Sequence, residues 1–406
     1  MPRDVGLLML ARVLMSASRA LASVIVPIYL TEIGFSATEL GVLFAFTAIT
    51  TAVLSSVVGV FADRFGRKPF LIGVPIVTAL AGLGFGFLHS VVAIFACATL
   101  GSLGRGAGAE GGTAGPYQPA EQAFIADATP SPHRNRAFVR LELATVVGAF
   151  LGSQLAWIPD LAARLGAQGA AADRPAFVAF SLCALLTALC AMSVIDQPRA
   201  KRSVAKHFTG PRKSTPFLLR LWATNSVDGL AGGFFGPFLT YWFYQRYGVS
   251  TGTIGLLYAI VNGTSLLSVL GAAPLARRAG LVRAIVFSRI LMATLVGLLA
   301  LAPTFWIAGA FYILRMIASR LANPLRQSYV MAVVPPEERG SIAALSQLPS
   351  QGTGALSQVL AGFLFEHLSL ALPFFGGAVL QVLNGVLFFG LFHDLRPPEE
   401  KGSTVG

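Results

Sequence analysis

Charged side chains stand within long apolar stretches of this sequence, and they are the first candidates for chemistry. They are the arginines Arg19, Arg105, Arg315 and Arg320 and the acids Glu110, Glu121 and Asp228. If the apolar stretches cross a lipid bilayer, each charge costs at least about 2.5–3.5 kcal/mol there, so each is a functional candidate. Arginine stays protonated, whereas a carboxylate can bind or release a proton as burial and a neighbouring arginine act against each other. The pattern predicts a site where a carboxylate alternates between pairing with an arginine and carrying a proton.

The acids differ in the role expected of them. Glu110 and Asp228 are the expected proton carriers, and Asn225 lies one helical turn before Asp228 on the same face. A permanent salt bridge between Asp228 and a buried arginine is the alternative. For Glu121 and Glu142, an ion pair towards the cytoplasmic side is the favoured interpretation.

The arginines and a group of aromatic residues indicate what the site could bind. Deep arginines outnumber deep acids, so a neutral amphipathic or anionic solute fits better than an obligate cation, because the arginine fork matches carboxylate or phosphate. In the segment 232–247, Phe234 and Phe238 lie one turn apart and could line an apolar pocket wall. Gly236 and Pro237 should kink the helix between them.

The apolar stretches are long enough to be membrane spans. The 406 residues are 55% hydrophobic and 12% charged, whereas a soluble domain is about a quarter charged. Stretches of about twenty residues recur, and each could cross ~30 Å of hydrocarbon as a helix. They lie at 6–31, 38–61, 69–88, 91–128, 136–158, 176–195, 216–245, 252–275, 284–301, 304–333, 340–366 and 370–392. The sequence therefore predicts an all-α membrane protein with twelve transmembrane helices.

Basic residues are distributed unevenly between the loops. Most loop arginines and lysines fall on one side of the predicted membrane, whereas Arg164, Arg174 and Arg246 fall on the other. By the positive-inside rule, both termini are expected in the cytoplasm. The expected location is the plasma (inner) membrane, as a multi-pass protein. The net charge of +12 thus reflects topology. The expected partners are the lipid bilayer and a small-molecule substrate, and not nucleic acid.

Cysteines and histidines indicate neither a disulfide framework nor a metal site. Cys97, Cys183 and Cys190 lie in predicted spans, where they are expected to be small buried hydrophobic side chains. All five histidines lie in loops or at span ends, so no histidine-built metal site is expected within the bundle. No cleavable signal peptide is evident. No cofactor is expected, and the proton gradient is the expected driving force.

The chain divides into two related halves. The polar stretch Asp196–Pro216 separates six spans from six, and residues 118–134 align with residues 323–339. Two six-helix repeats around a midplane cavity are typical of secondary transporters. We therefore expect an N-terminal bundle at 1–196, a basic cytoplasmic linker at 197–215, a C-terminal bundle at 216–393 and a short cytoplasmic tail at 394–406.

The segment GVFADRFGRK, residues 59–68, joins the second and third spans. Its pattern G-x-x-x-D-R-x-G-R-[RK] is complete, and the fixed positions are Gly59, Asp63, Arg64, Gly66, Arg67 and Lys68. Here the sequence resembles the major facilitator superfamily, whose signature loop has this pattern, and the resemblance extends over the whole chain. It implies the major facilitator fold, with two pseudo-symmetric six-helix halves that work by alternating access. A monomer is expected.

The same loop is expected to form a conformational gate. Asp63 could lie against a helix N-terminus of the other half, where its charge is favoured. The resemblance implies that the loop holds the outward-facing state and that its arginines pair with an acid at the end of span four, here Asp127. Arg134, which follows that span, belongs to the same expected gate. The alternative, that the loop arginines only anchor the topology, explains neither Asp63 nor the two glycines.

Span four contains an unusual stretch, RGAGAEGGTAGPYQPAEQ, at residues 105–122. A continuous helix over 91–128 would be about 57 Å long, so glycine and proline should break it near Gly111–Pro116. We expect an interrupted helix facing the translocation path, and a small-residue packing seam is the alternative. Arg105 resembles the span-four arginine of many proton-driven efflux members. Ala109 and the glycines of span five depart from the motifs of the drug/proton antiporters.

These features favour a secondary active transporter, with proton-coupled efflux of a small amphipathic or anionic compound as the leading hypothesis. The rival hypothesis is uptake of an organic anion or other nutrient by proton symport, and the sequence barely separates the two. A membrane-embedded enzyme or receptor is not favoured. The bundle offers no nucleophile with a base, and the chain leaves no room for a sensing domain.

Overall fold

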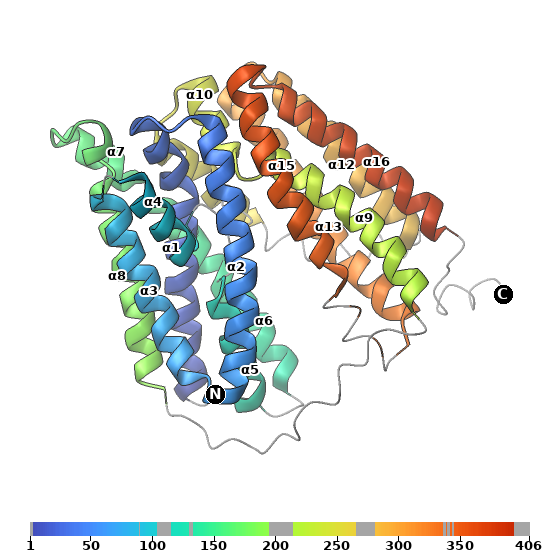
Figure 1. The fold of residues 1–406 in the computed structure, drawn as a ribbon, viewed down its shortest axis with the longest axis horizontal. Coiled ribbons are helices and arrows are strands. Elements are labelled where there is room, and N and C mark those ends of the chain that lie inside the picture. Colours follow the sequence, from blue (N-terminus) through green and yellow to red (C-terminus); the bar gives the residue numbers. More distant parts are fainter. Residues whose placement is uncertain are drawn as a thin grey trace. The chain divides into compact units, whose positions relative to one another are not determined.

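A computed structural model of the protein describes residues 3–88, 90–103, 115–129, 133–194, 214–264, 281–335, 338, 342 and 345–393. These residues form helices joined by short turns, and no strand occurs among them (Figure 1). The chain divides into two compact units. The first is Met1–Pro198 with Gly236–Gly263, and the second is Arg199–Phe235 with Thr264–Gly406.

The first unit is built around its N-terminal helix. Its elements are α1 (Arg3–Glu32), α2 (Ala37–Phe65), α3 (Lys68–Phe87), α4 (Val91–Leu100), α5 (Tyr117–Ala128), α6 (Arg134–Gln154), α7 (Trp157–Arg164), the short helix Gly169–Ala171, α8 (Arg174–Met192), α10 (Leu239–Tyr247) and the helical segment 251–264. Helix α1 packs against α6 and α8, and α3 packs against α8. Helix α2 begins with a capping box, in which Ser36 and Glu39 exchange backbone-to-side-chain hydrogen bonds.

Two glycines of α6 set its distance from α1. A Cβ added at Gly148 would lie 2.2 Å from the carbonyl oxygen of Val13, and one added at Gly152 would lie 2.0 Å from that of Ala17. No larger residue fits at these distances without moving the helices apart. The glycines of span five therefore form a small-residue packing seam, as membrane helices commonly do.

The second unit contains α9 (Thr215–Phe235), α12 (Leu281–Leu301), α13 (Phe305–Val333), α15 (Leu348–His367) and α16 (Leu372–Phe392). Helix α9 packs against α15 and α16, and α12 packs against α13 and α16. Close approach again depends on a glycine, because a Cβ at Gly229 would lie 2.2 Å from the carbonyl oxygen of Ser350.

The seventh predicted span, 216–245, is two helices. Helix α9 ends at Phe235, residues 236–238 form a turn, and α10 begins at Leu239. The kink expected at Gly236 and Pro237 is confirmed as a complete break. Proline causes it because it cannot donate the backbone hydrogen bond that a continuous helix needs.

This break changes how the predicted C-terminal bundle, 216–393, is packed. The segment 236–263 packs within the first unit, where the Thr240 hydroxyl donates to the Ser23 carbonyl oxygen at 3.0 Å. The compact units therefore differ from the two halves predicted along the sequence. The difference arises because the turn at 236–238 lets the chain leave α9 and pack against α1.

Several helices have the dimensions of membrane spans. Within the described residues, six are long and apolar enough to cross a membrane, at Asp4–Glu32, Ala37–Ala62, Lys68–Phe87, Arg136–Arg164, Gly169–Met192 and Leu372–Phe392. Val91–Leu100 and Ile285–Leu301 are shorter apolar helices. Each of the predicted spans contains a helix over its described residues.

Candidate transport site and gates

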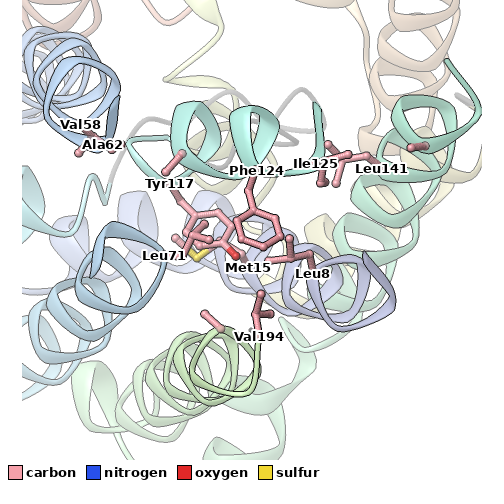
Figure 2. Packing of buried hydrophobic residues seen from close by; sticks show 13 residues of the cluster. Leu8, Met15, Val58, Ala62, Leu71, Tyr117, Phe124, Ile125, Leu141 and Val194 are labelled. Carbon is pink, nitrogen blue, oxygen red and sulfur yellow. The ribbon is translucent and has the colours of Figure 1, made fainter. Parts of the chain in front are cut away.

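The first unit contains a fully buried ion pair between α1 and α5. Glu121 pairs with Arg12, and the two side chains are 0% and 2% exposed. Tyr117 and Phe124, each about one turn from Glu121 on α5, extend into an apolar cluster that includes Met15 of α1 (Figure 2). The Tyr117 hydroxyl has no hydrogen-bond partner among the described residues. The carboxylate is therefore held by a single arginine in largely apolar surroundings, where protonation competes with pairing.

The sequence indicated one partner of this pair, Glu121, and not the other. An ion pair was the favoured interpretation for Glu121, and the structure contains one, but it is enclosed in the packed core of the first unit. Arg12 was not among the candidate residues. The available signal was an arginine within the otherwise apolar run LLMLARVLM, residues 7–15.

Arg19 is 8% exposed and binds the end of α4. Its guanidinium donates to the carbonyl oxygens of Gly101 at 2.9 Å and Ser102 at 2.6 Å. A Cβ added at Gly115 would lie 3.1 Å from Nη2 of Arg19. Carbonyl groups at a helix C-terminus lack partners and carry partial negative charge, so the guanidinium stabilises the end of α4. Arg19 thus contacts both edges of the interrupted fourth span.

As predicted, span four is not one continuous helix over its described residues. Helix α4 ends at Leu100, Ser102 has a left-handed φ of 50°, and α5 begins at Tyr117. Of the predicted break at Gly111–Pro116, residues 111–114 lie outside the described residues, and Gly115 and Pro116 directly precede α5. Helix α4 ends at Leu100, just before the two carbonyl groups that Arg19 binds.

The second unit holds its own ion pair, between α9 and α12. Asp228 accepts hydrogen bonds from both terminal nitrogens of Arg289, with Nη2 to Oδ2 at 3.3 Å. Asn384 of α16 donates to Oδ1 of Asp228 at 3.2 Å. This is the geometry of the salt bridge that was the alternative for Asp228. Arg289 was another residue that the sequence analysis missed.

Asn225 lies near Asp228 on α9 and is 2% exposed. Its amide nitrogen donates to the Ser346 carbonyl oxygen at 2.6 Å, and its amide oxygen accepts from Arg326 of α13. Arg326 was also missed, although it stands in the repeat segment 323–339. Asn225 thus links α9 to α13 in the same region as the Asp228 ion pair.

Helix α13 adds further positive charge to this region. The guanidinium carbon of Arg315 lies 4.5 Å from the ring centroid of Phe235, at the end of α9. The charges of Arg315 and Arg326, together with that of Arg289, act on Asp228. Arg320 lies further along α13 and is half-buried. The described part of this region therefore carries more positive than negative charge.

Phe234 and Phe238 do not share one helix face. The turn at 236–238 separates them, with Phe234 in the second unit and Phe238 in the first. Phe238 is 0% exposed and packs edge to face on Phe44 of α2, with ring centroids 5.4 Å apart. The expected spacing of one turn along a single helix is therefore wrong, because proline breaks the helix between the two rings; a role of the rings in lining an apolar pocket stays a prediction.

The loop between α2 and α3 is bound to α5. Nη1 of Arg67 lies 2.6 Å from Oδ2 of Asp127 and also donates to the carbonyl oxygen of Ala123. Gly66 ends α2 with a φ of 102°, which other residues adopt only with strain. Asp127 is 50% exposed, and surface ion pairs of this kind contribute about 0–1 kcal/mol. The contact can therefore form and break at low cost, and its role as a gate stays a prediction.

Of the other predicted gate and pathway residues, the structure describes some and not others. A Cβ at Gly59 would contact Pro119 of α5 at 3.8 Å, Arg64 lies 5.6 Å from the Phe65 ring centroid, and Lys68 begins α3. Arg105 and Glu110 lie outside the described residues, and for Asp63 and Arg134 only the backbone is described.

The chain matches the family model described as Major Facilitator Superfamily twice, over residues 8–225 and 221–405. The chain belongs to this superfamily. The two matches together span nearly the whole chain and overlap at residues 221–225, shortly after the predicted linker at 197–215. The superfamily consists of secondary transporters, so the protein is a multi-pass membrane transporter.

Curated relatives in the superfamily include efflux proteins. Multidrug resistance protein 1 of Bacillus subtilis (strain 168) is 22% identical over 374 residues, which cover 89% of this chain and 89% of that protein. Multidrug resistance protein MdtG of Escherichia fergusonii is 28% identical over 302 residues, which cover 69% of this chain and 68% of that protein. A Na(+), Li(+), K(+)/H(+) antiporter of Planococcus maritimus is 35% identical over 120 residues, but these cover only 28% of this chain and 27% of the antiporter.

Solved structures of superfamily members share the fold. A D-xylose-proton symporter has a TM-score of 0.74 at 16% identity, covering 95% of this chain and 97% of its own. The nucleoside transporter NupG has a TM-score of 0.74 at 14% identity, covering 97% and 99%. At these identities the likeness extends to the major facilitator fold and not to a substrate.

Proposed function

We propose that the protein exports a small amphipathic or anionic compound by alternating access, coupled to proton movement. The observation that carries the proposal is the buried Arg12–Glu121 pair. A carboxylate enclosed in this way must either stay paired with Arg12 or bind a proton, because an unpaired buried charge is strongly unfavourable. Switching between these two states is what proton coupling needs.

Of Glu121 and Asp228, the acids of the two buried ion pairs described above, Glu121 is the better candidate for the proton carrier. It has one arginine partner and lies beside the apolar cluster around Met15. Asp228 is instead held by Arg289 and Asn384 and by the charges of further arginines, all of which favour its charged form. We therefore assign Asp228 the role of a fixed counter-ion. Glu110 stays a predicted carrier.

The charge of the second unit supports the substrate class. Arg315 and Arg326 lie near a single acid that already pairs with Arg289. A guanidinium stacked on an aromatic ring, as Arg315 is on Phe235, keeps donors for a carboxylate or phosphate group and offers an apolar face beside them. An amphipathic anion matches both features.

The direction of transport and the location are part of the proposal. The names of the two multidrug resistance relatives support efflux. Uptake by proton symport is the alternative, because the span-five glycines serve packing and do not carry the antiporter motif. We place the protein in the plasma (inner) membrane with both termini in the cytoplasm, on the distribution of basic residues.

The test is proton movement by the purified full-length chain in proteoliposomes that contain a pH-sensitive dye. A panel of anionic and neutral amphipaths is applied, and the initial rate of pH change is measured. Glu121→Gln is the test variant. Glu142→Gln is the matched control, because Glu142 lies near the charge of Glu121 but is exposed on α6.

The expected result is substrate-driven proton movement in the wild type and in the control variant. Glu121→Gln should lose the proton movement while still exchanging labelled substrate across the membrane. Opposite flux of proton and substrate supports antiport, and parallel flux supports symport. Substrate movement without proton movement in the wild type would overturn proton coupling, and intact proton movement in Glu121→Gln would overturn the assignment of the carrier.

A further inference from the structure

An acid after α6 makes three hydrogen bonds to a segment far away in sequence. The Asp160 carboxylate accepts from the hydroxyls of Ser250 at 2.6 Å and Thr251 at 2.9 Å, and from the backbone N–H of Gly252 at 3.2 Å. Asp160 belongs to α7, Ser250 directly precedes the helical segment 251–264, and Thr251 and Gly252 begin it. These four residues are named the Asp160 latch below.

The position of the carboxylate is electrostatically favourable. The first N–H groups of a helix lack intrahelical partners and carry partial positive charge, which a carboxylate neutralises. A Cβ added at Gly252 would lie 2.6 Å from Oδ2 of Asp160 and 2.5 Å from the Trp157 ring, and one at Gly255 would lie 2.3 Å from the Ser153 carbonyl oxygen. The two surfaces therefore fit closely, and only glycine is tolerated between them.

Further contacts hold the same segment in place. The Thr240 hydroxyl donates to the Ser23 carbonyl oxygen and lies 2.8 Å from the Tyr258 hydroxyl, and Phe238 packs on Phe44. The segment 236–263 belongs to the second half of the sequence and is joined to α9 by the turn at 236–238. Its partners α1, α2 and α7 belong to the first half. Within the first unit, these contacts therefore hold chain from one repeat against helices from the other.

We propose that the Asp160 latch closes the predicted outer end of the transport path and opens once in each transport cycle. The proposal rests on alternating access in the proposed function, in which the two repeats separate at one end at a time. The latch suits this role because it consists of hydrogen bonds to one half-buried carboxylate, which can be exchanged for water. It would act at the outer end as the signature loop is expected to act at the cytoplasmic end.

The first test measures how often the latch opens. Thr240 is 2% exposed and belongs to the segment that the latch holds. Thr240→Cys therefore serves as the reporter, in full-length protein without its native cysteines, held in lipid nanodiscs. Asp160→Asn and Thr251→Val should each raise the rate of maleimide labelling about tenfold, which corresponds to about 1.4 kcal/mol. Glu39→Gln is the control, since Glu39 caps α2 and, among the described residues, its carboxylate bonds to Ser36 of the same turn. It should leave the labelling rate unchanged.

The second test locks the latch. In the same reporter protein, Asp160→Cys with Ser250→Cys should form a disulfide that prevents labelling at Thr240→Cys, and a reductant should restore it. For the control, Cys97 is kept in the reporter protein and paired with Gly84→Cys, which gives a disulfide within the first repeat; a Cβ at Gly84 would lie 2.6 Å from the Cys97 sulfur. This disulfide should not affect the reporter.

Unchanged labelling in both latch variants, or labelling that persists in the locked protein, would mean that the contact is static and would overturn the proposal. Neither measurement needs a substrate. If the latch behaves as expected while no proton moves in proteoliposomes, proton coupling fails and the latch stands. If proton movement is found and the locked protein is still labelled, the latch fails alone.

Discussion

Removing one partner of the Arg12–Glu121 pair should lower the free energy of unfolding strongly, whereas removing both partners should not. The side chains are 2% and 0% exposed, so neither can be solvated by water if the other is lost. Loss of one partner of a buried pair costs about 3–5 kcal/mol, whereas replacing both by apolar residues of similar volume is neutral or stabilising by about 1–4 kcal/mol. Arg12→Met should therefore destabilise the protein strongly, and Arg12→Met with Glu121→Met should restore its stability.

The size of the effect can be stated as a shift in thermal midpoint. For a domain of about 150–250 residues, 1 kcal/mol corresponds to about 2–4 °C. Arg12→Met should therefore lower the midpoint of the first unit by about 6–20 °C, and the double variant should recover most of this. The assay is thermal unfolding of the purified full-length chain in one detergent, followed by circular dichroism.

The double-mutant cycle also decides whether the pair exists as described. If Arg12→Met alone changes stability by less than about 1 kcal/mol, the two charges are solvated and the buried pair is refuted. If the loss of stability in the double variant equals the sum of the losses in Arg12→Met and Glu121→Met, the charges do not interact. A stable double variant has a further use. It should be folded and yet fail to couple substrate to protons, which separates the structural role of the pair from its proposed role in transport.

Two other perturbations test the packing seam and the cytoplasmic gate. Gly152→Ala places a methyl group about where the Ala17 carbonyl oxygen lies, so α1 and α6 must separate. The purified protein should therefore lose thermal stability or fail to assemble. An unchanged unfolding midpoint would contradict the close approach of the two helices. Arg67→Ala removes the ion pair with the half-exposed Asp127 and the hydrogen bond to the Ala123 carbonyl oxygen. The free energy of unfolding should fall by about 1–3 kcal/mol, and the initial rate of transport should change because the gate is weakened. Wild-type transport in Arg67→Ala would argue that the loop arginine serves topology alone.

Much of the fold follows from local properties of the chain. The apolar stretches predict where helices form, because a span needs about twenty apolar residues. The break at Pro237 is predictable because the missing N–H is a property of that residue alone. The interruption of span four was also predictable, because glycine and proline disfavour a continuous helix there. The residue at which α4 ends was not predictable. That end lies beside Arg19, which reaches Gly101 and Ser102 from another helix.

The partners of the buried acids could not be predicted, because they depend on how neighbouring helices are rotated against each other. Hydropathy identifies a charge inside a span but does not say which helix faces it. Ranking charges by depth favoured Arg19 and Arg315 and omitted Arg12, Arg289 and Arg326, which make the direct contacts. A buried carboxylate requires a partner, so every arginine within an apolar stretch was a candidate, whatever its depth.

The repeat alignment shows how the charge at one aligned position differs between the two repeats. Aligning residues 118–134 with 323–339 places Glu121 opposite Arg326. Each bonds to the first helix of its own repeat, Glu121 to Arg12 of α1 and Arg326 to Asn225 of α9. The same position is thus an acid with a cationic partner in one repeat and a cation with a neutral partner in the other. A proton on Glu121 can release Arg12, whereas Arg326 bonds to the neutral amide of Asn225 at that contact and keeps its positive charge. This asymmetry is the physical basis for assigning proton binding to the first unit and attraction of an anionic group to the second.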